Sequence, residues 1–177
     1  MAQLSATCFG QQLCAFTTDG SEKAQGLKIK FSVPCQWKSE GSSGKYVRTY
    51  EYEDGEAAIA EMISIANPSK PITPGRIDEL IAADTYKKLG EKDGSFLWGV
   101  KLKVDGQDCA EVAMKLKKKI MFTTLHVYIM RYILYCKNKA VTMNFMVTAE
   151  TDQEAKKYFN TYKTIFRNLA TATNLPD

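Results

Sequence analysis

The most restrictive feature of this sequence is the stretch 123–136, which is apolar in both registers of a two-residue repeat. Leu125 and Val127 fall in one register, and Tyr128 and Met130 fall in the other. Alternate residues of a strand point to opposite faces, so a strand with this pattern is buried on both sides. Such a strand belongs inside a sheet whose two faces are covered, and it therefore predicts a layered domain.

The rest of the chain offers strands with one buried face. Six segments alternate apolar and polar residues and are predicted to be strands: 27–33, 46–52, 57–66, 96–104, 110–116 and 141–147. A helix competes at 57–66 because alanine and glutamate favour helices, but its β-branched residues and the preceding Asp54-Gly55 turn favour a strand. The Ser- and Gly-rich segment 39–44 is predicted to be a loop.

Two helices are expected. Thr73-Pro74 resembles a helix start, and apolar spacing up to Leu89 with Gly90 after it predicts one helix of about 15 residues. Thr151 and Glu154 form a capping box before a long amphipathic stripe that ends at Leu169. This second helix is expected to pack on the sheet, with the stripe as core.

These elements predict an α+β fold: an antiparallel sheet of about seven strands, a helix after the third strand and a long C-terminal helix packed on the sheet. Residues 1–26 are expected to form a flexible N-terminal segment, and 27–177 a single domain. The chain has 177 residues, of which 45% are hydrophobic, which excludes a wholly disordered protein. No apolar stretch approaches the roughly 20 residues of a membrane-spanning helix.

The cysteines exclude a structural zinc site but leave the pairing open. Cys8, Cys14, Cys35, Cys109 and Cys136 include no C-x-x-C pair, and the chain has one histidine. Cys8 and Cys14 are close enough in sequence to pair, and an odd number leaves at least one free thiol. Cys109 and Cys136 are interpreted as small apolar residues within strands.

Arg131 and His126 are the candidate ligand-binding residues. Arg131 interrupts the apolar register that holds Val127 and Ile133, and a buried guanidinium requires a partner. A carboxylate such as Glu111 on a neighbouring strand is one explanation, and an anion-binding pocket between sheet and helix is the other. A pocket of about 300 Å³ near Arg131 would support a ligand. His126 is either a structural residue or a base whose orienting partner the sequence does not identify.

The remaining motifs give little chemistry. The sequence shows no nucleophile motif and no phosphate-binding loop, so we expect no catalysis, cofactor or metal. Lys115 and Lys117–Lys119 form a basic run, and Tyr46, Tyr50 and Tyr52 alternate on a strand. Together they suggest nucleic-acid binding, but a lysine-rich strand end also prevents edge aggregation, and a net charge of +4 is mild.

The order of elements resembles the photosystem II extrinsic subunit P (PsbP) family, the bacterial DcrB-like proteins and the Ran-binding Mog-type proteins. The resemblance covers residues 27–171 and includes Phe31-Ser32-Val33-Pro34 with Trp37, the helix from Pro74, the hairpin 123–147 and the helix from Thr151. It implies a non-enzymatic accessory or binding protein, often extracytoplasmic. No site residue carries over from the family.

These observations lead to three functional expectations. The first is a non-catalytic accessory or binding protein, periplasmic or secreted, whose partner is a protein or a small hydrophobic ligand. Residues 1–26 lack a signal peptide, but their Ser-, Thr-, Gln- and Gly-rich composition fits a secreted protein after signal removal. The second is a cytosolic protein-interaction adaptor that uses the lysine- and tyrosine-rich surfaces. The third is a nucleic-acid binder or an enzyme without a recognisable motif.

Overall fold

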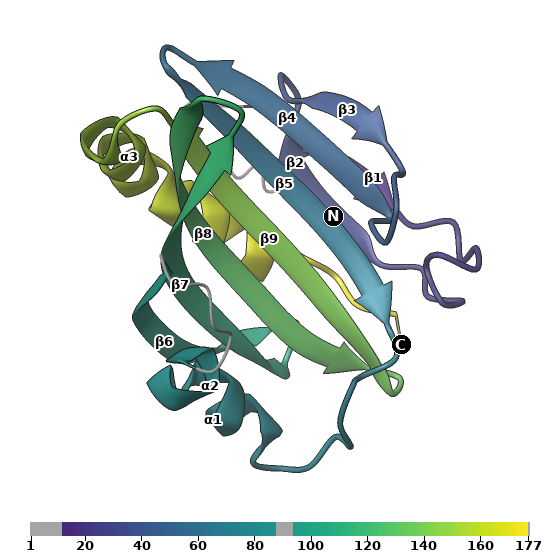
Figure 1. The fold of residues 1–177 in the computed structure, drawn as a ribbon. Helices are drawn as coiled ribbons and strands as arrows, with labels where there is room; N and C mark the ends of the chain where they lie inside the picture. The colour runs from purple at the N-terminus through teal and green to yellow at the C-terminus, as the bar shows by residue number, and fades with distance from the viewer. Residues whose placement is uncertain (1–11, 88–93, 177) are drawn as a thin grey trace.

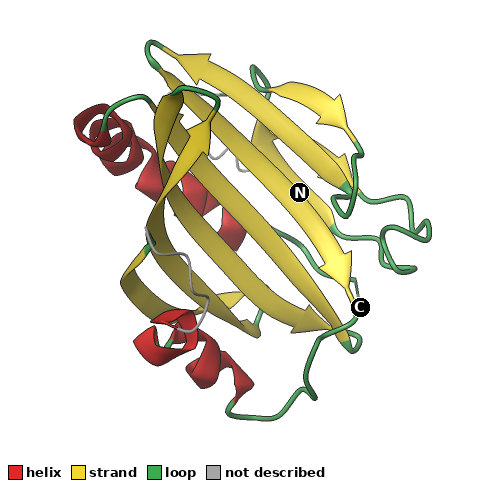
Figure 2. Ribbon diagram, viewed as in Figure 1, coloured by secondary structure: helices red, strands yellow, loops and turns green. Residues whose placement is uncertain are grey.

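A computed structural model describes residues 12–87 and 94–176 as nine strands and three helices. In chain order these are β1 (Leu13–Thr17), β2 (Lys30–Pro34), β3 (Lys38–Gly41), β4 (Arg48–Asp54), β5 (Ala57–Ala66), α1 (Arg76–Ile81), α2 (Ala83–Lys87), β6 (Ser95–Val104), β7 (Gln107–Ile120), β8 (Thr123–Cys136), β9 (Lys139–Ala149) and α3 (Asp152–Thr171). The α+β fold predicted from the sequence is confirmed (Figure 2).

Seven strands form one antiparallel sheet in the order β3-β4-β5-β9-β8-β7-β6, and β1 pairs with β2 in a second, small sheet (Figure 1). The predicted strand 123–136 is β8, an inner strand between β9 and β7. Two-residue turns join β4 to β5, β6 to β7, β7 to β8 and β8 to β9. Short turns of this kind favour antiparallel neighbours, so most of the sheet follows the chain order.

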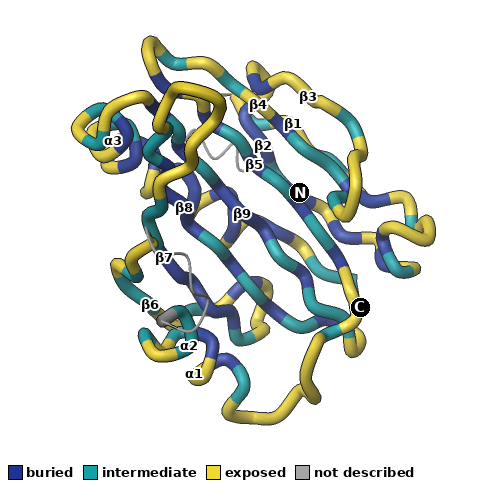
Figure 3. Tube along the Cα trace, in the orientation of Figure 1, coloured by how far each residue is buried: buried dark blue, intermediate teal, exposed yellow. Residues whose placement is uncertain are grey.

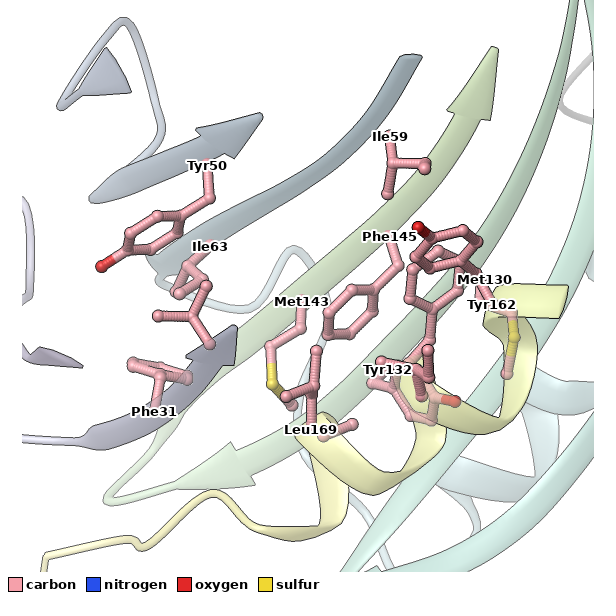
Figure 4. Packing of buried hydrophobic residues seen from close by; sticks show 14 of the residues in the cluster. Phe31, Tyr50, Ile59, Ile63, Met130, Tyr132, Met143, Phe145, Tyr162 and Leu169 are labelled. Carbon is pink, nitrogen blue, oxygen red and sulfur yellow. The ribbon is translucent and has the colours of Figure 1, made fainter. Parts of the chain in front are cut away.

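One side of the large sheet, the covered face, carries the core. Met130 and Tyr132 of β8 point to this side, where α3 and the small sheet pack (Figures 1 and 4). Phe145 of β9 is fully buried, and its ring centroid lies 5.7 Å from that of Tyr132 and 5.0 Å from that of Phe166 on α3. The predicted packing of the C-terminal helix on the sheet is confirmed.

The opposite side, the front face, holds Ile129, Arg131 and Ile133 of β8, and α1 and α2 cover it over β6 and β7. Gly99 of β6 allows this helix to approach closely. A Cβ atom at Gly99 would lie 2.1 Å from the backbone oxygen of Ile81, the last residue of α1. No described helix or strand lies over β5 and β9 on this side (Figure 1).

The number of strands in the large sheet agrees with the sequence prediction, but the set of strands differs. The strand predicted at 27–33 is β2, which lies in the small sheet, while β3 takes an edge position beside β4. The loop prediction for 39–44 is wrong over residues 39–41, which belong to β3. Because these side chains are polar and largely exposed, backbone pairing forms the strand without any alternation of hydrophobicity.

The single helix predicted from Pro74 to Leu89 is two short helices. Ala82 between them is extended (φ −73°, ψ 132°). The hydroxyl of Thr85 donates a hydrogen bond to the carbonyl of Glu79, so a side chain uses an acceptor that a continuous helix would pair with a backbone N–H group. Gly75, not Thr73, is the N-cap residue, and it makes no side-chain capping bond. The predicted end at Leu89 and Gly90 lies outside the described residues.

The segment before residue 27 contains a strand that the sequence analysis did not predict. β1 pairs with β2, and this brings Cys14 within a Cα–Cα distance of 4.9 Å from Cys35, to which it is disulfide-bonded. The suggested pairing of Cys14 with Cys8 is therefore wrong; Cys8 itself lies outside the described residues. Cys109 and Cys136 are buried free thiols in strands, as predicted. The domain boundary at residue 26 stays a prediction.

Candidate functional site

The two predicted site residues lie on the same strand but do not form one site. His126 and Arg131 are five positions apart on β8, so they point to opposite faces of the sheet. His126 faces the start of α3 on the covered face, within 3.5 Å of Asp152. Arg131 is on the front face, opposite Asn144 of β9. Each residue must therefore be judged in its own surroundings.

Arg131 is held in place by an amide. Its Nε donates a hydrogen bond of 2.7 Å to Oδ1 of Asn144, a residue that is only 6% exposed. Arg131 itself is half-buried, and no described residue forms an ion pair with it. The guanidinium is thus oriented through one nitrogen, and among the described residues no carboxylate forms an ion pair with it.

The predicted pairing of Arg131 with Glu111 is wrong. Glu111 lies opposite Tyr132 in the β7–β8 register and therefore points to the covered face. There it is fully buried and accepts hydrogen bonds from Arg167 Nε at 2.7 Å, Trp98 Nε1 at 3.0 Å and the Tyr132 hydroxyl at 3.0 Å. Burial alone would raise the pKa of Glu111, but these hydrogen bonds outweigh it and lower the pKa.

A second arginine is on the helix that covers part of the front face. Arg76, the first residue of α1, has a side chain that is 11% exposed, and it forms an ion pair with Glu79. Both guanidinium groups act on Tyr86 of α2. Burial raises the pKa of Tyr86, and the positive charges of Arg131 and Arg76 offset only part of that rise. A hydrogen bond with Tyr135 raises the pKa of Arg76 as well, although the larger cause is the hydrogen bond with Glu79.

We call Arg76, Tyr86, Arg131, Tyr135 and Asn144 the arginine cluster. Arg76 of α1 and Arg131 of β8 both act electrostatically on Tyr86 of α2, Arg76 also interacts with Tyr135, and the buried amide of Asn144 orients Arg131. Guanidinium forks bind carboxylates and phosphates through paired N–H groups. Arg131 can therefore bind an anionic group, whereas the guanidinium of Arg76 is already paired with Glu79. Sequence reasoning identified Arg131 but missed Arg76, because it did not indicate which side chains of the helix face the sheet.

His126 has an orienting partner that sequence reasoning did not identify. Its Nδ1 lies 3.5 Å from Oδ1 of Asp152, the first residue of α3. The same carboxylate accepts a 3.0 Å hydrogen bond from the Tyr128 hydroxyl and lies 3.5 Å from Nζ of Lys115. Burial and this hydrogen bond raise the pKa of Tyr128 to about 12. The carboxylate thus links β7, β8 and α3, which favours the structural interpretation of His126.

The tyrosines and lysines considered for nucleic-acid binding lie apart. Tyr50 is 8% exposed, and Tyr52 stacks on Trp37 at a centroid distance of 6.5 Å. β5, β9 and β8 separate their strand β4 from the lysines of β7, a distance of roughly 19 Å at ordinary strand spacing. The structure therefore does not combine the tyrosines and the lysines in one surface.

A surface pocket of about 360 Å³ lies at the end of the sheet near the C-terminus. Its lining includes Gln107, Tyr135, Lys137 and Leu175, but not Arg131. Among the described residues, no group of three His, Cys, Asp or Glu side chains is arranged to hold a metal ion. No helix within residues 12–87 and 94–176 has the length and apolarity that crossing a membrane requires.

Comparison with known proteins identifies the fold. The sequence matches no protein-family model and no curated protein. The structure is similar to cyanobacterial PsbP (CyanoP) from Synechocystis sp. PCC 6803, with a TM-score of 0.56, 14% identity and 99% of each chain covered. LpqN of Mycobacterium tuberculosis has a TM-score of 0.55 and 13% identity over 93% of this chain and 92% of that one.

The Saccharomyces cerevisiae Ran-binding protein Mog1p is also similar, with a TM-score of 0.52 and 10% identity over 94% of this chain and 97% of that chain. At such low identities these likenesses show the fold alone. The predicted PsbP-, DcrB- and Mog-type fold is therefore confirmed, and the function has to be argued from the surface of this chain.

Proposed function

We propose that this chain is a non-catalytic accessory or binding protein that acts outside the cytoplasm and recognises a partner protein on its front face. The observation that carries the proposal is the arginine cluster, in which Arg131 is oriented by Asn144 and forms no ion pair with a described carboxylate. The same fold serves a Ran-binding protein, so protein recognition is a function that the fold can support.

The surroundings of Arg131 suit a protein interface. Met62 of β5 and Met146 of β9 lie half-buried on the front face, and Thr142 lies between them and the β8–β9 turn. Methionine adapts to irregular partners, and arginine is enriched among the residues that dominate binding energy. A partner that presents an aspartate or glutamate would pair with Arg131 while apolar groups cover the methionines.

The disulfide supports an extracytoplasmic location. Cys14 and Cys35 join β1 to the chain directly after β2. Disulfides persist in oxidising compartments and are rare in the cytosol, where thiols are kept reduced. Trapping thiols by alkylation in intact cells tests this location: the pair should resist alkylation unless a reductant is added, and a fully alkylated pair would favour the cytosolic adaptor.

Site-specific photocrosslinking in the cells that make the protein tests the binding surface. A photoreactive phenylalanine analogue is placed at Thr142 on the front face, and at Lys163 on the exposed side of α3 as a control. We expect one partner protein, identified by mass spectrometry, to crosslink from position 142 and not from position 163. The Arg131→Gln variant should reduce that crosslink at least tenfold, because a charge-assisted hydrogen bond is lost.

Two results would contradict the proposal. The first is the same set of crosslinks from positions 142 and 163, which would show that the front face has no preferred partner. The second is an Arg131→Gln variant that crosslinks as efficiently as the parent protein. Circular dichroism of each variant separates a change in binding from a loss of fold.

A further inference from the structure

The turn between β7 and β8 exposes large apolar side chains at the end of a long hairpin. Phe122 is 101% exposed, Met121 86% and Ile120 44%. All residues from 117 to 124 are exposed, and the tip extends beyond the part of the hairpin that packs in the sheet (Figure 3). Scattered exposed apolar residues are ordinary, but adjacent, fully exposed apolar side chains at a protruding tip point to a contact surface.

The geometry of the turn does not require these residues. The β4–β5 hairpin also has a two-residue turn, Gly55-Glu56, and in both turns only the first residue has a left-handed φ, +57° for Gly55 and +52° for Met121. A left-handed φ favours glycine because a Cβ atom is crowded there. Folding alone therefore favours glycine at position 121 and a polar residue at 122, and the apolar pair indicates a role outside folding.

Three consecutive lysines of β7 lie at the base of the tip. Lys117, Lys118 and Lys119 are consecutive strand residues, so they point alternately to the covered face and the front face. All three are exposed, and none forms an ion pair with another described residue. Lys115, further from the tip, is paired with Asp152. The hairpin thus ends in an apolar tip next to three lysines that no described carboxylate neutralises.

We propose that this tip docks the protein on a membrane surface that contains anionic lipid. Met121 and Phe122 enter the boundary between headgroups and acyl chains, and Lys117, Lys118 and Lys119 contact the headgroups. Apolar burial and attraction to anionic lipid add in such interfacial binding, and long lysine stems can lie along the apolar region with the charge in the headgroup layer. This contact is independent of the front-face interaction proposed above.

The shape of the tip favours lipid over a protein partner. The apolar residues form a narrow convex end, with lysines on both faces of the ribbon. A protein would need a matching apolar pocket surrounded by acidic groups on both sides, whereas a fluid anionic interface adapts to a convex insert. The β4–β5 turn and the start of α3 lie at the same end of the molecule as the tip (Figure 1). They carry Glu56 and Glu154, and the hydrogen bond and charge of Glu154 raise the pKa of Glu56. They oppose close approach of the rest of that end to anionic lipid, so contact is confined to the tip.

Co-sedimentation of the full chain with vesicles tests the proposal. One set of vesicles contains phosphatidylcholine alone, and the other contains phosphatidylcholine with phosphatidylglycerol. We expect binding to the phosphatidylglycerol vesicles that weakens as salt is added. The Met121→Gly/Phe122→Ser variant should lose on the order of thirtyfold in partitioning, because two apolar side chains are no longer buried. Its thermal midpoint should not fall, since the new turn matches the geometry of Gly55-Glu56.

Variants with matched changes elsewhere separate the two contributions. Replacing Lys117, Lys118 and Lys119 by glutamine should cost about fivefold per lysine on phosphatidylglycerol vesicles. Replacing the three exposed α3 lysines by glutamine changes the net charge equally and should leave binding nearly intact; these are Lys156, Lys157 and Lys163. Ile72→Ser removes an apolar side chain of 39% exposure away from the tip and should have no effect.

A fluorescent variant reports the position of the tip directly. The emission of Phe122→Trp should shift to shorter wavelength on phosphatidylglycerol vesicles, because the indole leaves water. Absence of binding to these vesicles by the parent protein would overturn the proposal and leave the tip as a protein contact. Equal binding by the parent and the Met121→Gly/Phe122→Ser variant would overturn it as well.

Discussion

The two faces of the large sheet are built from the same strands, but their side chains differ in burial and in the number of hydrogen-bond partners. On β9, Phe145 points to the covered face and is fully buried between rings of β8 and α3, while the adjacent Met146 points to the front face and is half-buried. Glu111 on the covered face accepts three side-chain donors, whereas Arg131 on the front face has one amide partner. The covered face supplies stability, and the front face leaves side chains partly exposed, where we propose that a partner binds.

The largest effect on stability is expected from a buried carboxyl group on the covered face. Glu61 of β5 is 1% exposed, its Oε2 has no hydrogen-bond partner, and burial raises its pKa from 4.5 to about 8. The folded state keeps a proton that the unfolded chain releases, so the free energy of unfolding falls as pH rises from 4.5 to 8. The expected loss is roughly 4–5 kcal/mol.

Urea unfolding over this pH range measures the effect. Glu61→Gln should abolish the pH dependence and be more stable than the parent at pH 8, because an amide needs no proton to stay neutral. Glu51→Gln on the exposed front side of β4 is the matched control and should follow the parent. A parent protein whose stability is flat or rises between pH 4.5 and 8 would contradict the assignment.

Two adjacent residues of β9 give the next largest difference. Phe145→Ala should lower the free energy of unfolding by about 4 kcal/mol, because it leaves a cavity in a rigid core. Met146→Ala should lower it by about 1 kcal/mol, since its side chain already meets solvent. Chemical denaturation of both variants checks the pair, and similar losses would show that the front face is also a packed core.

The smallest expected difference concerns the charged side chains. Glu111→Gln removes the charge that Arg167 binds and should cost about 2 kcal/mol, less than for a fully buried pair because the Arg167 side chain is 51% exposed. Arg131→Gln should change stability by no more than about 0.5 kcal/mol. Thermal and urea unfolding of both variants measure these losses. If Arg131→Gln lowers the free energy of unfolding as much as Glu111→Gln does, Arg131 contributes to folding and the recognition role proposed for it loses its basis.

The sequence predicted the elements whose signal is local. The two apolar registers of 123–136 identified β8, the capping box at Thr151 and Glu154 marked the start of α3, and Asp54-Gly55 marked the turn between β4 and β5. β1 and β3 escaped prediction because their side chains do not alternate between buried and exposed in a clear pattern. Backbone pairing forms them, and a pairing between distant segments leaves no local signal.

The candidate site was only partly predictable. A charged residue in an apolar register identified Arg131 from the sequence alone. Its partner was predicted wrongly because the β7–β8 register decides which residues of β7 lie on the same face as Arg131. In the structure Val112, not Glu111, is opposite Arg131. Arg76 and Asp152 reach their sites through helix packing, which depends on contacts far along the chain.

The close contact between Gly99 and α1 affects the position of Arg76, although Gly99 contributes no side chain to the arginine cluster. α1 approaches the backbone of β6 there, and Arg76 is the first residue of the same helix. Any larger residue at position 99 must push the helix outward and move Arg76 with it. Selection for an anion of a particular size would therefore act on a glycine that never touches it.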